Sequence, residues 1–398
     1  MGRIGIYGGT FNPPHAGHGY AAGQAVRKLS LDRLLLVPAS IPPHKSMPEG
    51  TPRAEVRLDL VRLAARQIPR AEVCDLELRR PGKSYTADTV LELRRQYPDD
   101  DLILLMGTDM LLSFLQWYRP DSICRNAALA VLYRGGEKRA VLDMADRQAE
   151  QIRSRLGGRV TFVENDALAI SSTDVRRMLT FQCASTLLPA GVMDRIQEMG
   201  LYGVNRSLRG LPLSELERTA CALLDPKRVN HVLGCRDTAV RLARRYDADP
   251  TDAARAALLH DVTKAVPPIL QLKLCEKYGI IMDDFFRENP KTLHAVTGAA
   301  VARHIFGERE AVCDAIAWHT TGRSGMSVLE KILYVADYIE PNRSFPGVEP
   351  LRSAADKSLE EALLLGLELS ASVLKQEKRQ VAPASQQAMA ALKGRKVP

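Results

Sequence analysis

Two glycines and two histidines near the start of the chain have the types and spacing of a phosphate-binding loop. The first apolar run ends in Gly8 and Gly9, and His15 and His18 follow at the start of a helical pattern. Glycines let backbone N–H groups come close to a phosphate, and the positive end of the next helix adds to the attraction. Both histidines can point into one crevice and donate hydrogen bonds to phosphate oxygens as charge builds up in a transition state. This segment predicts phosphate chemistry rather than an ordinary helix-capping loop.

A second segment with related chemistry lies far downstream. Ser171, Ser172 and Thr173 follow a strand-like run and open another helical pattern, with Arg176 one turn in. Hydroxyls and unbonded backbone N–H groups at a helix N-terminus, next to a guanidinium, can form a second phosphate cradle. Alone, this sequence is an ordinary helix cap. Paired with the first loop, it becomes a specific sign of phosphate binding.

The second half of the chain contains histidines and aspartates suited to holding metal ions. Five of the eight histidines lie there, and the series runs His231, His260 with Asp261, His294, His319 and Asp337. Imidazole and carboxylate ligands on separate helices are how metal centres are built inside all-helical domains. Asp261 ends an apolar helical segment, where a carboxylate is costly to bury without a metal or a cation. His304 falls outside the series and is interpreted as a surface or structural residue.

The composition is that of a soluble globular protein with two domains. At 398 residues the chain exceeds what one core usually organises, and apolar and charged residues make up 45% and 26% of it. No stretch approaches the roughly 18 to 20 apolar residues of a membrane span, and the N-terminus has no signal-like apolar core. We expect a cytoplasmic protein with no membrane partner. The seven cysteines are isolated, which predicts reduced thiols, mostly in the core.

The net charge of +8 does not by itself indicate nucleic-acid binding. The basic residues are spread along the chain, and no aromatic residues interleave with a basic run. A phosphate-rich small substrate accounts for the charge equally well. We therefore expect no nucleic-acid partner, and the sequence leaves open whether the chain forms a homo-oligomer.

Residues 1–203 alternate strand-like and helix-like segments. The runs interpreted as strands are Gly2–Tyr7, Arg33–Val37, Ala71–Asp75, Leu102–Met106, Ala128–Tyr133 and Arg159–Glu164. Helical patterns lie between them, for instance over Arg53–Gln67 and Tyr85–Gln96. The alternation predicts an α/β, Rossmann-like domain with a parallel sheet wrapped by helices. Ligands of such sheets bind beyond the carboxyl ends of the strands, where the first loop falls.

Strand patterns end after Tyr202. The polar, glycine-bearing stretch 204–213 is suited to a linker, residues 214–381 are predicted to form an all-α domain, and residues 382–398 are expected to fray. The expected helices are Leu213–Leu224, Val229–Tyr246, Pro250–His260, Pro267–Tyr278, Thr292–Phe306, Glu308–His319, Val328–Ile339 and Leu359–Lys375. The candidate metal ligands would then come from several different helices.

The two phosphate-binding segments together resemble the nucleotidylyltransferase superfamily, whose hallmarks are a His-x-Gly-His loop and a late Ile-Ser-Ser-Thr-x-x-Arg motif. Further segments narrow the resemblance to the bacterial nicotinate-nucleotide adenylyltransferases over about residues 1–203: Pro42–Lys45, Ser84–Thr89, Met106–Asp109 and the segment around Trp117. The resemblance implies in-line attack by the phosphate of nicotinate mononucleotide on the α-phosphorus of ATP, assisted by Mg²⁺, to give deamido-NAD and pyrophosphate. Positioning and charge stabilisation carry such a reaction, which suits a site rich in His, Lys, Arg and backbone amides.

The same resemblance assigns roles to residues of this half. The expected catalytic set is His15 and His18 at the triphosphate, Lys45 at the phosphate of the second substrate, and Arg176. The expected nucleotide and substrate contacts are Gly8, Gly9, Thr10, Phe11, Ser172 and Thr173, with Gly107 and Asp109 at the adenosine, Thr86, Trp117 and Tyr118 around the pyridine ring, and Arg134.

The chain departs from the family pattern at two places. Thr108 stands where alanine is expected between Gly107 and Asp109, and Gly135 stands where proline is expected after Arg134. Neither departure removes a charged group, so the reaction class is kept. The preference for nicotinate over nicotinamide mononucleotide stays open.

The order His, His-Asp, His, His, Asp resembles the HD superfamily of metal phosphohydrolases. Closer matches over about residues 214–375 look like the YqeK family of symmetrical diadenosine tetraphosphate hydrolases: Leu258–Asp261, Leu293–Gly298, Ala317–Arg323 and Tyr334–Arg343. That family implies hydrolysis of diadenosine tetraphosphate to two ADP by a water that bridges two metal ions, expected to be iron.

The HD resemblance also distributes the ligands. It places His231, His260, Asp261 and Asp337 around one metal, and Asp261, His294 and His319 around the other. Lys264 and Arg323 are the candidates for polyphosphate contacts, with Arg343 beside them. In one departure, Val262 and Thr263 follow Asp261 where an aromatic residue is expected, which would affect substrate packing and not metal binding.

Three alternatives remain on the sequence alone. One half could be a regulatory or scaffolding module, although neither half has lost a charged or ligating residue. The substrates could be those of a pantetheine-phosphate adenylyltransferase or cytidylyltransferase in the first half, and of a nucleotidase or cyclic-nucleotide phosphodiesterase in the second. The segments Pro42–Lys45 and Ser84–Thr86 argue against the first pair, and the segments around His319 and Asp337 argue against the second. The third is nucleic-acid processing, because HD domains also occur in RNA-handling enzymes.

Overall fold

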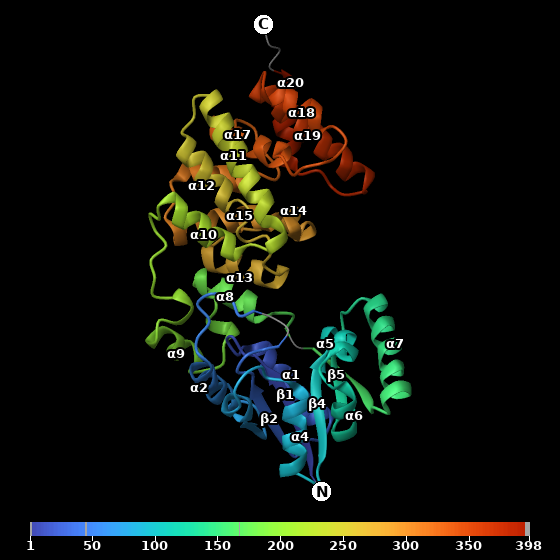
Figure 1. Ribbon diagram of the computed structural model, residues 1–398. Helices are drawn as coiled ribbons and strands as arrows, with labels where there is room; N and C mark the ends of the chain where they lie inside the picture. Colours follow the sequence, from blue (N-terminus) through green and yellow to red (C-terminus); the bar gives the residue numbers. More distant parts are fainter. Residues whose placement is uncertain (1, 44–45, 167, 395–398) are drawn as a thin grey trace. The chain divides into compact units, whose positions relative to one another are not determined.

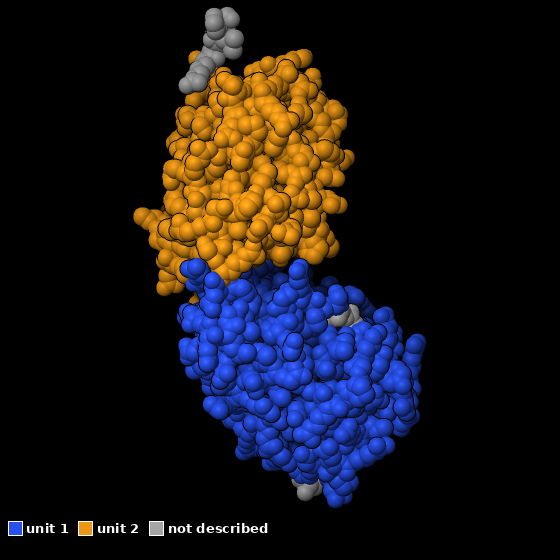
Figure 2. Space-filling model, turned by 60° about the vertical axis from the view of Figure 1, so that its left-hand side comes forward, with its two compact units in different colours: residues 1–205 blue, residues 206–398 orange. Residues whose placement is uncertain are grey.

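The computed structural model describes residues 2–43, 46–166 and 168–394. The chain forms two compact units, residues 1–205 and 206–398 (Figures 1 and 2). The first unit is built on a parallel sheet, and the second contains only helices among its described residues. The predicted fold class, an α/β domain followed by an all-α domain, is therefore confirmed. Within the described ranges, no helix is long and apolar enough to cross a membrane.

Six parallel strands form the sheet, in the order β3-β2-β1-β4-β5-β6. Their bounds are β1 Arg3–Gly9, β2 Arg33–Pro38, β3 Ala71–Val73, β4 Asp101–Gly107, β5 Ala128–Arg134 and β6 Val160–Asn165. All six predicted strands are present, each within two residues of its expected bounds. The chain winds outward in opposite directions from β1 and β4, so the loops after these two strands diverge and leave a crevice at the carboxyl edge.

Helices cover both faces of this sheet. They are α1 Ala16–Lys28, α2 Ala54–Ala65, α3 Leu76–Arg79, α4 Thr86–Gln96, α5 Thr108–Ser113, α6 Pro120–Asn126, α7 Arg139–Leu156, α8 Ser172–Thr180 and α9 Val192–Glu198. On β4, Leu104 joins the core beneath α4, α6 and α7, while Ile103 and Leu105 join the core beneath α1 and α2. Side chains alternate along a strand, and both faces are covered, which explains why these strands are apolar throughout.

Phe11 lies in the core beneath the first loop. Its side chain is 2% exposed and packs with residues of α1 and α2, among them Ala22 and Val61. The backbone at Phe11 is left-handed, with φ 45°, and a Cβ added to Gly9 would come within 3.2 Å of the ring. The expectation that Phe11 lines the nucleotide site is therefore wrong for its side chain, because the turn folds the ring back onto the sheet.

The second unit is a bundle centred on five helices that pack against one another: α11 Val229–Arg245, α12 Pro250–Leu259, α15 Leu293–Val301, α16 Glu310–Trp318 and α17 Val328–Ile339 (Figure 1). Around them lie α10 Leu213–Leu223, α13 Pro268–Tyr278, α14 Asp284–Glu288, α18 Val348–Ala355, α19 Leu359–Gln376 and α20 Pro383–Gly394. Each of the eight predicted helices is present, although the segment predicted as Thr292–Phe306 ends in a wider π-helical turn over Ala302–Phe306.

The C-terminal segment is helical over Pro383–Gly394, so the expectation that residues 382–398 fray is wrong for that part. Ala388 is buried, and Ser385 Oγ donates to the carbonyl of Thr321 at 2.6 Å. The helix contacts α19, where Lys393 Nζ lies 2.7 Å from Glu368 Oε1. Alanine and polar residues make up most of this segment, so its apolar periodicity is weak, which explains why the pattern did not predict the helix.

The cysteines form no disulfide. Cys235, Cys275 and Cys313 are buried, and the other four are half-buried. The prediction of reduced thiols agrees with this arrangement, although fewer than half of them belong to the core.

The position of Phe11 predicts that it stabilises the first unit. Phe11→Ala should lower the free energy of unfolding of this unit by about 3–5 kcal/mol, because it removes a buried ring and leaves a cavity. Denaturant unfolding followed by tryptophan fluorescence measures this, and a Trp318→Phe background leaves Trp117 as the reporter of the first unit. Tyr20→Ala, at a side chain 50% exposed, is the control and should change stability by less than about 0.5 kcal/mol. Equal effects of the two substitutions would contradict the assignment.

Candidate active sites

A cavity of about 760 Å³ opens at the carboxyl edge of the sheet in the first unit. All predicted substrate-contact residues of the first unit that the structure describes line this cavity, except Phe11. They are Gly8, Gly9, Thr10, His15, His18, Thr86, Gly107, Asp109, Trp117, Tyr118, Arg134, Ser172, Thr173 and Arg176. Lys45 lies outside the described residues. The loops after β1 and β4 both line this cavity, where the order of the strands predicts a ligand site.

Direct hydrogen bonds join the two phosphate-binding segments. Arg176 Nη1 donates to the carbonyl of Asn12 at 2.7 Å, and Ser172 Oγ donates to the carbonyl of Pro13 at 3.0 Å. Arg176 Nη2 also reaches Thr173 Oγ1 at 3.0 Å. The N-terminus of α8 is therefore fixed against the first loop, and both helix N-termini, those of α1 and α8, lie at the same cavity.

The two histidines of the first loop stack at the start of α1. Their ring centroids are 3.6 Å apart, and the backbone N–H of His15 donates to His18 Nδ1 at 3.2 Å. This bond assigns the proton of neutral His18 to Nε2, which can then act as a donor. Burial, followed by the nearby His18 and Arg134, lowers the pKa of His15 to about 2. His15 is therefore neutral at physiological pH.

Arg57 on α2 is a part of this site that the sequence analysis missed. Its side chain is 2% exposed, and it donates to the carbonyls of Thr10 at 2.7 Å and Ser40 at 2.9 Å. It thereby ties together the loops after β1 and β2. Burial lowers the pKa of Arg57. The sequence did contain a sign of this role, because Arg57 occupies the apolar face of its helix, four positions before Val61.

Aromatic rings form one part of the cavity wall. The rings of Tyr85 and Tyr118 lie 4.6 Å apart, and Trp117 packs on Phe114 with its centroid 5.4 Å away. Thr86 begins α4 beside Tyr85. Aromatic faces of this kind suit a planar ring. Tyr85 lies in the Ser84–Thr89 segment, but the sequence did not predict it as a contact residue.

Both departures from the adenylyltransferase pattern involve the loop after β5. Thr108 is buried, and its hydroxyl donates to Glu137 Oε1 at 3.2 Å, which also accepts the backbone N–H of Arg134 at 3.2 Å. A Cβ added to Gly135 would come within 2.7 Å of Glu164 Oε1. These residues shape the loop that carries Arg134, whereas the aromatic wall comes from α4 and the segment after α5.

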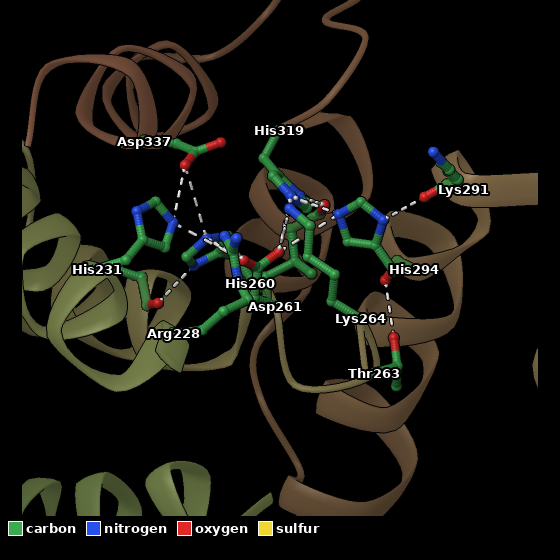
Figure 3. A network of polar contacts seen from close by, with 12 residues as sticks. Arg228, His231, His260, Asp261, Thr263, Lys264, Lys291, His294, His319 and Asp337 are labelled. Carbon is green, nitrogen blue, oxygen red and sulfur yellow. Dashed lines mark hydrogen bonds and ion pairs between the residues drawn. The ribbon is translucent and has the colours of Figure 1, made fainter. Parts of the chain in front are cut away.

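In the second unit, the six predicted metal ligands converge around Asp261 (Figure 3). On the Oδ2 side, His231 Nε2 and His260 Nε2 lie 3.7 and 3.4 Å from the carboxylate, and Asp337 Oδ1 lies 3.1 Å from His231 Nε2. On the Oδ1 side, His294 Nε2 and His319 Nε2 lie 3.3 and 3.7 Å away, and 3.2 Å from each other. Asp261 is thus placed to bridge two groups of ligands.

Three of these histidines are oriented by backbone carbonyls of their own segments. The Nδ1 atoms of His260, His294 and His319 lie 2.7, 2.6 and 2.7 Å from the carbonyls three residues earlier, those of Ala257, Lys291 and Ile316. A carbonyl only accepts, so each Nδ1 carries the proton and each Nε2 presents a lone pair to the cluster.

The donor set fits divalent cations. Nε2 of His231, Nε2 of His260 and Oδ1 of Asp261 are buried and make no hydrogen bond of normal geometry, although ionisable groups lie within 3.4 Å of each. Buried polar atoms without partners are costly, and convergent imidazole and carboxylate atoms are metal ligands. Two groups of three residues each bring one possible ligand atom per residue within 4.8 Å of one another. One group is His231, His260 and Asp337, and the other is His260, Asp261 and His319.

Cationic side chains surround the two carboxylates. Lys264 Nζ lies 3.1 Å from Asp261 Oδ1, Arg343 Nη2 lies 2.7 Å from Asp337 Oδ1, and Arg228 pairs with Asp261 Oδ2. Burial by itself would raise the pKa of Asp261, but the histidines around it, His260 foremost, hold that pKa well below its usual range. Arg228 was missed, although it stands one helical turn before a predicted ligand.

Two further residues of this half have partners within the protein. Arg323 Nε donates to the buried Glu330 at 2.6 Å, and its guanidinium lies 5.5 Å from the ring centre of Trp318, so it also supports the N-terminus of α17; its contact with polyphosphate stays a prediction. Thr263 is fully buried, and its hydroxyl donates to the carbonyl of His294 at 3.0 Å, so it holds the segment that carries His294 in place.

His304 is exposed, as expected for a residue outside the cluster. Its ring stacks on Tyr278, with centroids 4.9 Å apart.

Comparison with known proteins assigns each half to a family. The cytidylyltransferase-like family matches residues 6–178, and the HD domain family matches residues 228–342. A probable nicotinate-nucleotide adenylyltransferase of Exiguobacterium sibiricum is 36% identical over 201 residues, which are 50% of this chain and 98% of that protein. One of Aeromonas salmonicida is 39% identical over 208 residues, 50% of this chain and 96% of that protein.

The second half is similar to a crystal structure described as a predicted HD superfamily hydrolase involved in NAD metabolism from Clostridium acetobutylicum. The identity is 37%, the match covers 47% of this chain and 99% of the other, and the TM-score is 0.46. Since the relatives of the first half are covered almost from end to end, the chain belongs through that half to the nicotinate-nucleotide adenylyltransferase family, and a helical HD domain follows it.

Proposed function

We propose that the first unit transfers the adenylyl group of ATP to nicotinate mononucleotide, giving deamido-NAD and pyrophosphate for NAD biosynthesis. The observation that carries this proposal is the junction of the two phosphate-binding segments, where Arg176 and Ser172 are bonded to the first loop beside His15 and His18. Membership of the adenylyltransferase family supports the choice of substrates.

The chemistry needs positioned charge rather than a nucleophilic side chain. A phosphate oxygen of nicotinate mononucleotide attacks the α-phosphorus of ATP in line, and pyrophosphate leaves from the opposite side. The Nε2–H of His18, the guanidinium of Arg176 and the N-terminus of α8 would stabilise charge that builds up on the leaving group. Mg²⁺ bound with ATP would supply further positive charge to the phosphates.

The aromatic wall is the proposed site for the pyridine ring. Tyr85 and Tyr118 would face the ring, with Trp117 and Thr86 beside them. Lys45 remains the predicted contact for the phosphate of this substrate. Parallel assays with nicotinate and nicotinamide mononucleotide would decide the preference that the two loop departures leave open.

We further propose that the second unit hydrolyses diadenosine tetraphosphate symmetrically to two ADP. The observation that carries this proposal is the single carboxylate, Asp261, shared between two groups of ligands. His231, His260 and Asp337 would hold one metal ion and His294 and His319 the other, with iron as the expected metal. Such ions supply positive charge at the scissile phosphate and a water with a lowered pKa.

The cations around the cluster suit a polyphosphate substrate. Lys264 and Arg228 reach Asp261, and Arg343 reaches Asp337, so their charges lie where phosphate groups would approach the ligands. The alternative is that the HD domain acts on another nucleotide or serves as a regulatory binding module. Turnover of the purified chain distinguishes these possibilities.

A paired turnover assay on the full chain tests both proposals. One reaction contains ATP, nicotinate mononucleotide and Mg²⁺, and the other contains diadenosine tetraphosphate and Fe²⁺. His18→Ala should reduce adenylyl transfer by about 100- to 1,000-fold because it removes a donor to the transition state, and Asp261→Ala should abolish hydrolysis because it removes the shared ligand. Each variant should keep the other reaction, and His304→Ala, at an exposed histidine, should keep both.

Two results would count against this assignment. A folded wild-type chain that binds the nucleotide but shows no turnover in one assay would make that half a binding module or an enzyme with another substrate. Loss of both reactions in a single variant would show that the two sites are not independent.

The pKa of His15 predicts how pH affects the first unit. Because burial lowers this pKa from 6.5 to about 2, at intermediate pH the unfolded chain binds a proton that the folded chain does not. The stability contributed by neutral His15 is therefore complete above about pH 6.5 and decreases as the pH falls.

A comparison with His15→Asn measures this effect. Between pH 6 and pH 4, the difference in unfolding free energy, wild type minus variant, should decrease by up to about 1.4 kcal/mol per pH unit. Denaturant titrations in the Trp318→Phe background, read through Trp117, give the values for the first unit. A difference that stays constant over this range would show that His15 titrates alike in the folded and unfolded chain.

A further inference from the structure

His231 is oriented differently from the other cluster histidines. His260, His294 and His319 each direct Nδ1 to a backbone carbonyl three residues earlier. His231 lies in the first turn of α11, and its Nδ1 faces a carboxylate instead, with Glu340 Oε1 at 3.1 Å. The partner comes from the end of α17, 109 residues later in the chain. The geometry of this one ligand therefore depends on a contact between two helices.

Glu340 is itself held in place. It is 1% exposed, and its Oε2 accepts the backbone N–H of Asn342 at 2.7 Å and the side-chain amide of Asn342 at 2.9 Å. The same amide nitrogen donates to the carbonyl of Asn230 at 3.1 Å, next to His231 in α11. Both carboxylate oxygens of Glu340 are thus bonded. Oε1 contacts His231, and Oε2 contacts Asn342, which is itself bonded to the helix that carries His231.

Gly234 supplies the space that this carboxylate occupies. A Cβ added there would lie 2.5 Å from Glu340 Oε2 and 3.0 Å from Asn342 Nδ2. Gly234 follows His231 by one turn, within the interior of α11. A glycine at such a position lowers helix stability relative to alanine. The close approach of Glu340 gives a physical reason for glycine at this position.

We propose that Glu340 is the positioning residue for His231 in the metal site of the HD domain, an inference that rests on the proposed metal-dependent function. By accepting from Nδ1–H it selects the tautomer and aims Nε2 at the space shared with His260 and Asp337. Its negative charge also makes the imidazole a stronger ligand than one oriented by a neutral carbonyl. The cation on the His231 side should therefore depend on Glu340, and the cation on the His294 and His319 side should not.

Titration of the metal-free full-length protein with Co²⁺ tests this, followed by calorimetry and by visible absorption. Glu340→Ala should weaken one of the two Co²⁺ equivalents by about 10- to 100-fold and leave the other unchanged. Glu340→Gln should weaken the same equivalent less, because its amide oxygen still accepts the hydrogen bond while the charge is lost. Gly234→Ala keeps the carboxylate but displaces it, and should act in the same direction as Glu340→Ala.

The control is Glu308→Gln, at a glutamate whose side chain is 3% exposed and pairs with Arg255 at 2.6 Å, and this variant should leave both affinities at the wild-type value. Wild-type affinity for both equivalents in Glu340→Ala would overturn the inference, as would equal weakening of both equivalents. If the wild-type chain bound no Co²⁺, the metal-dependent function itself would fail, and this inference with it. The number of Co²⁺ equivalents bound by the wild type separates these two failures.

Discussion

Burying charge away from water is the constraint on which both sites depend. A buried ion is tolerated only when surrounding groups compensate it. In the first unit Arg57 meets this condition with two backbone carbonyls, those of Thr10 and Ser40. In the second unit Asp261, with no exposed surface, meets it with imidazoles and with the side chains of Arg228 and Lys264. Each buried charge therefore requires particular loops or helices to meet around it.

The hydrogen bonds that compensate the buried charge of Arg57 help to shape the cavity at the carboxyl edge of the sheet. Strand order alone brings the loops after β1 and β4 to one crevice. The guanidinium then fixes the loop after β1 to the loop after β2, and Arg176 fixes it to the start of α8. Phe11 fills the space below. The loop is held from several directions before any ligand binds, which reduces the conformational entropy that binding would cost.

In the helical unit, compensation of the buried Asp261 charge depends on groups at increasing distance from it. The candidate metal ligands surround Asp261, backbone carbonyls and Glu340 orient their imidazole rings, and buried side chains such as Thr263 hold the segments that carry them. Next to His294, the buried Gln271 donates from Nε2 to the carbonyl of Thr263 and accepts at Oε1 from the hydroxyl of Thr297. Departures from a family pattern can therefore fall in the supporting layer, as at Thr263 and Thr108, and leave the reacting groups unchanged.

The amino-acid sequence by itself determined the two domains' fold class, the six strands and the six candidate metal ligands that the structure clusters, because periodicity and residue type are local properties of the chain. It did not reveal that Phe11 faces the core, that Arg323 supports a helix, or that the tail packs as α20. Nor did it single out Arg57, Arg228 and Glu340, whose partners lie on other elements. Only the tertiary structure decided these, since the partner of a buried polar group is set by which distant segments the packing brings together.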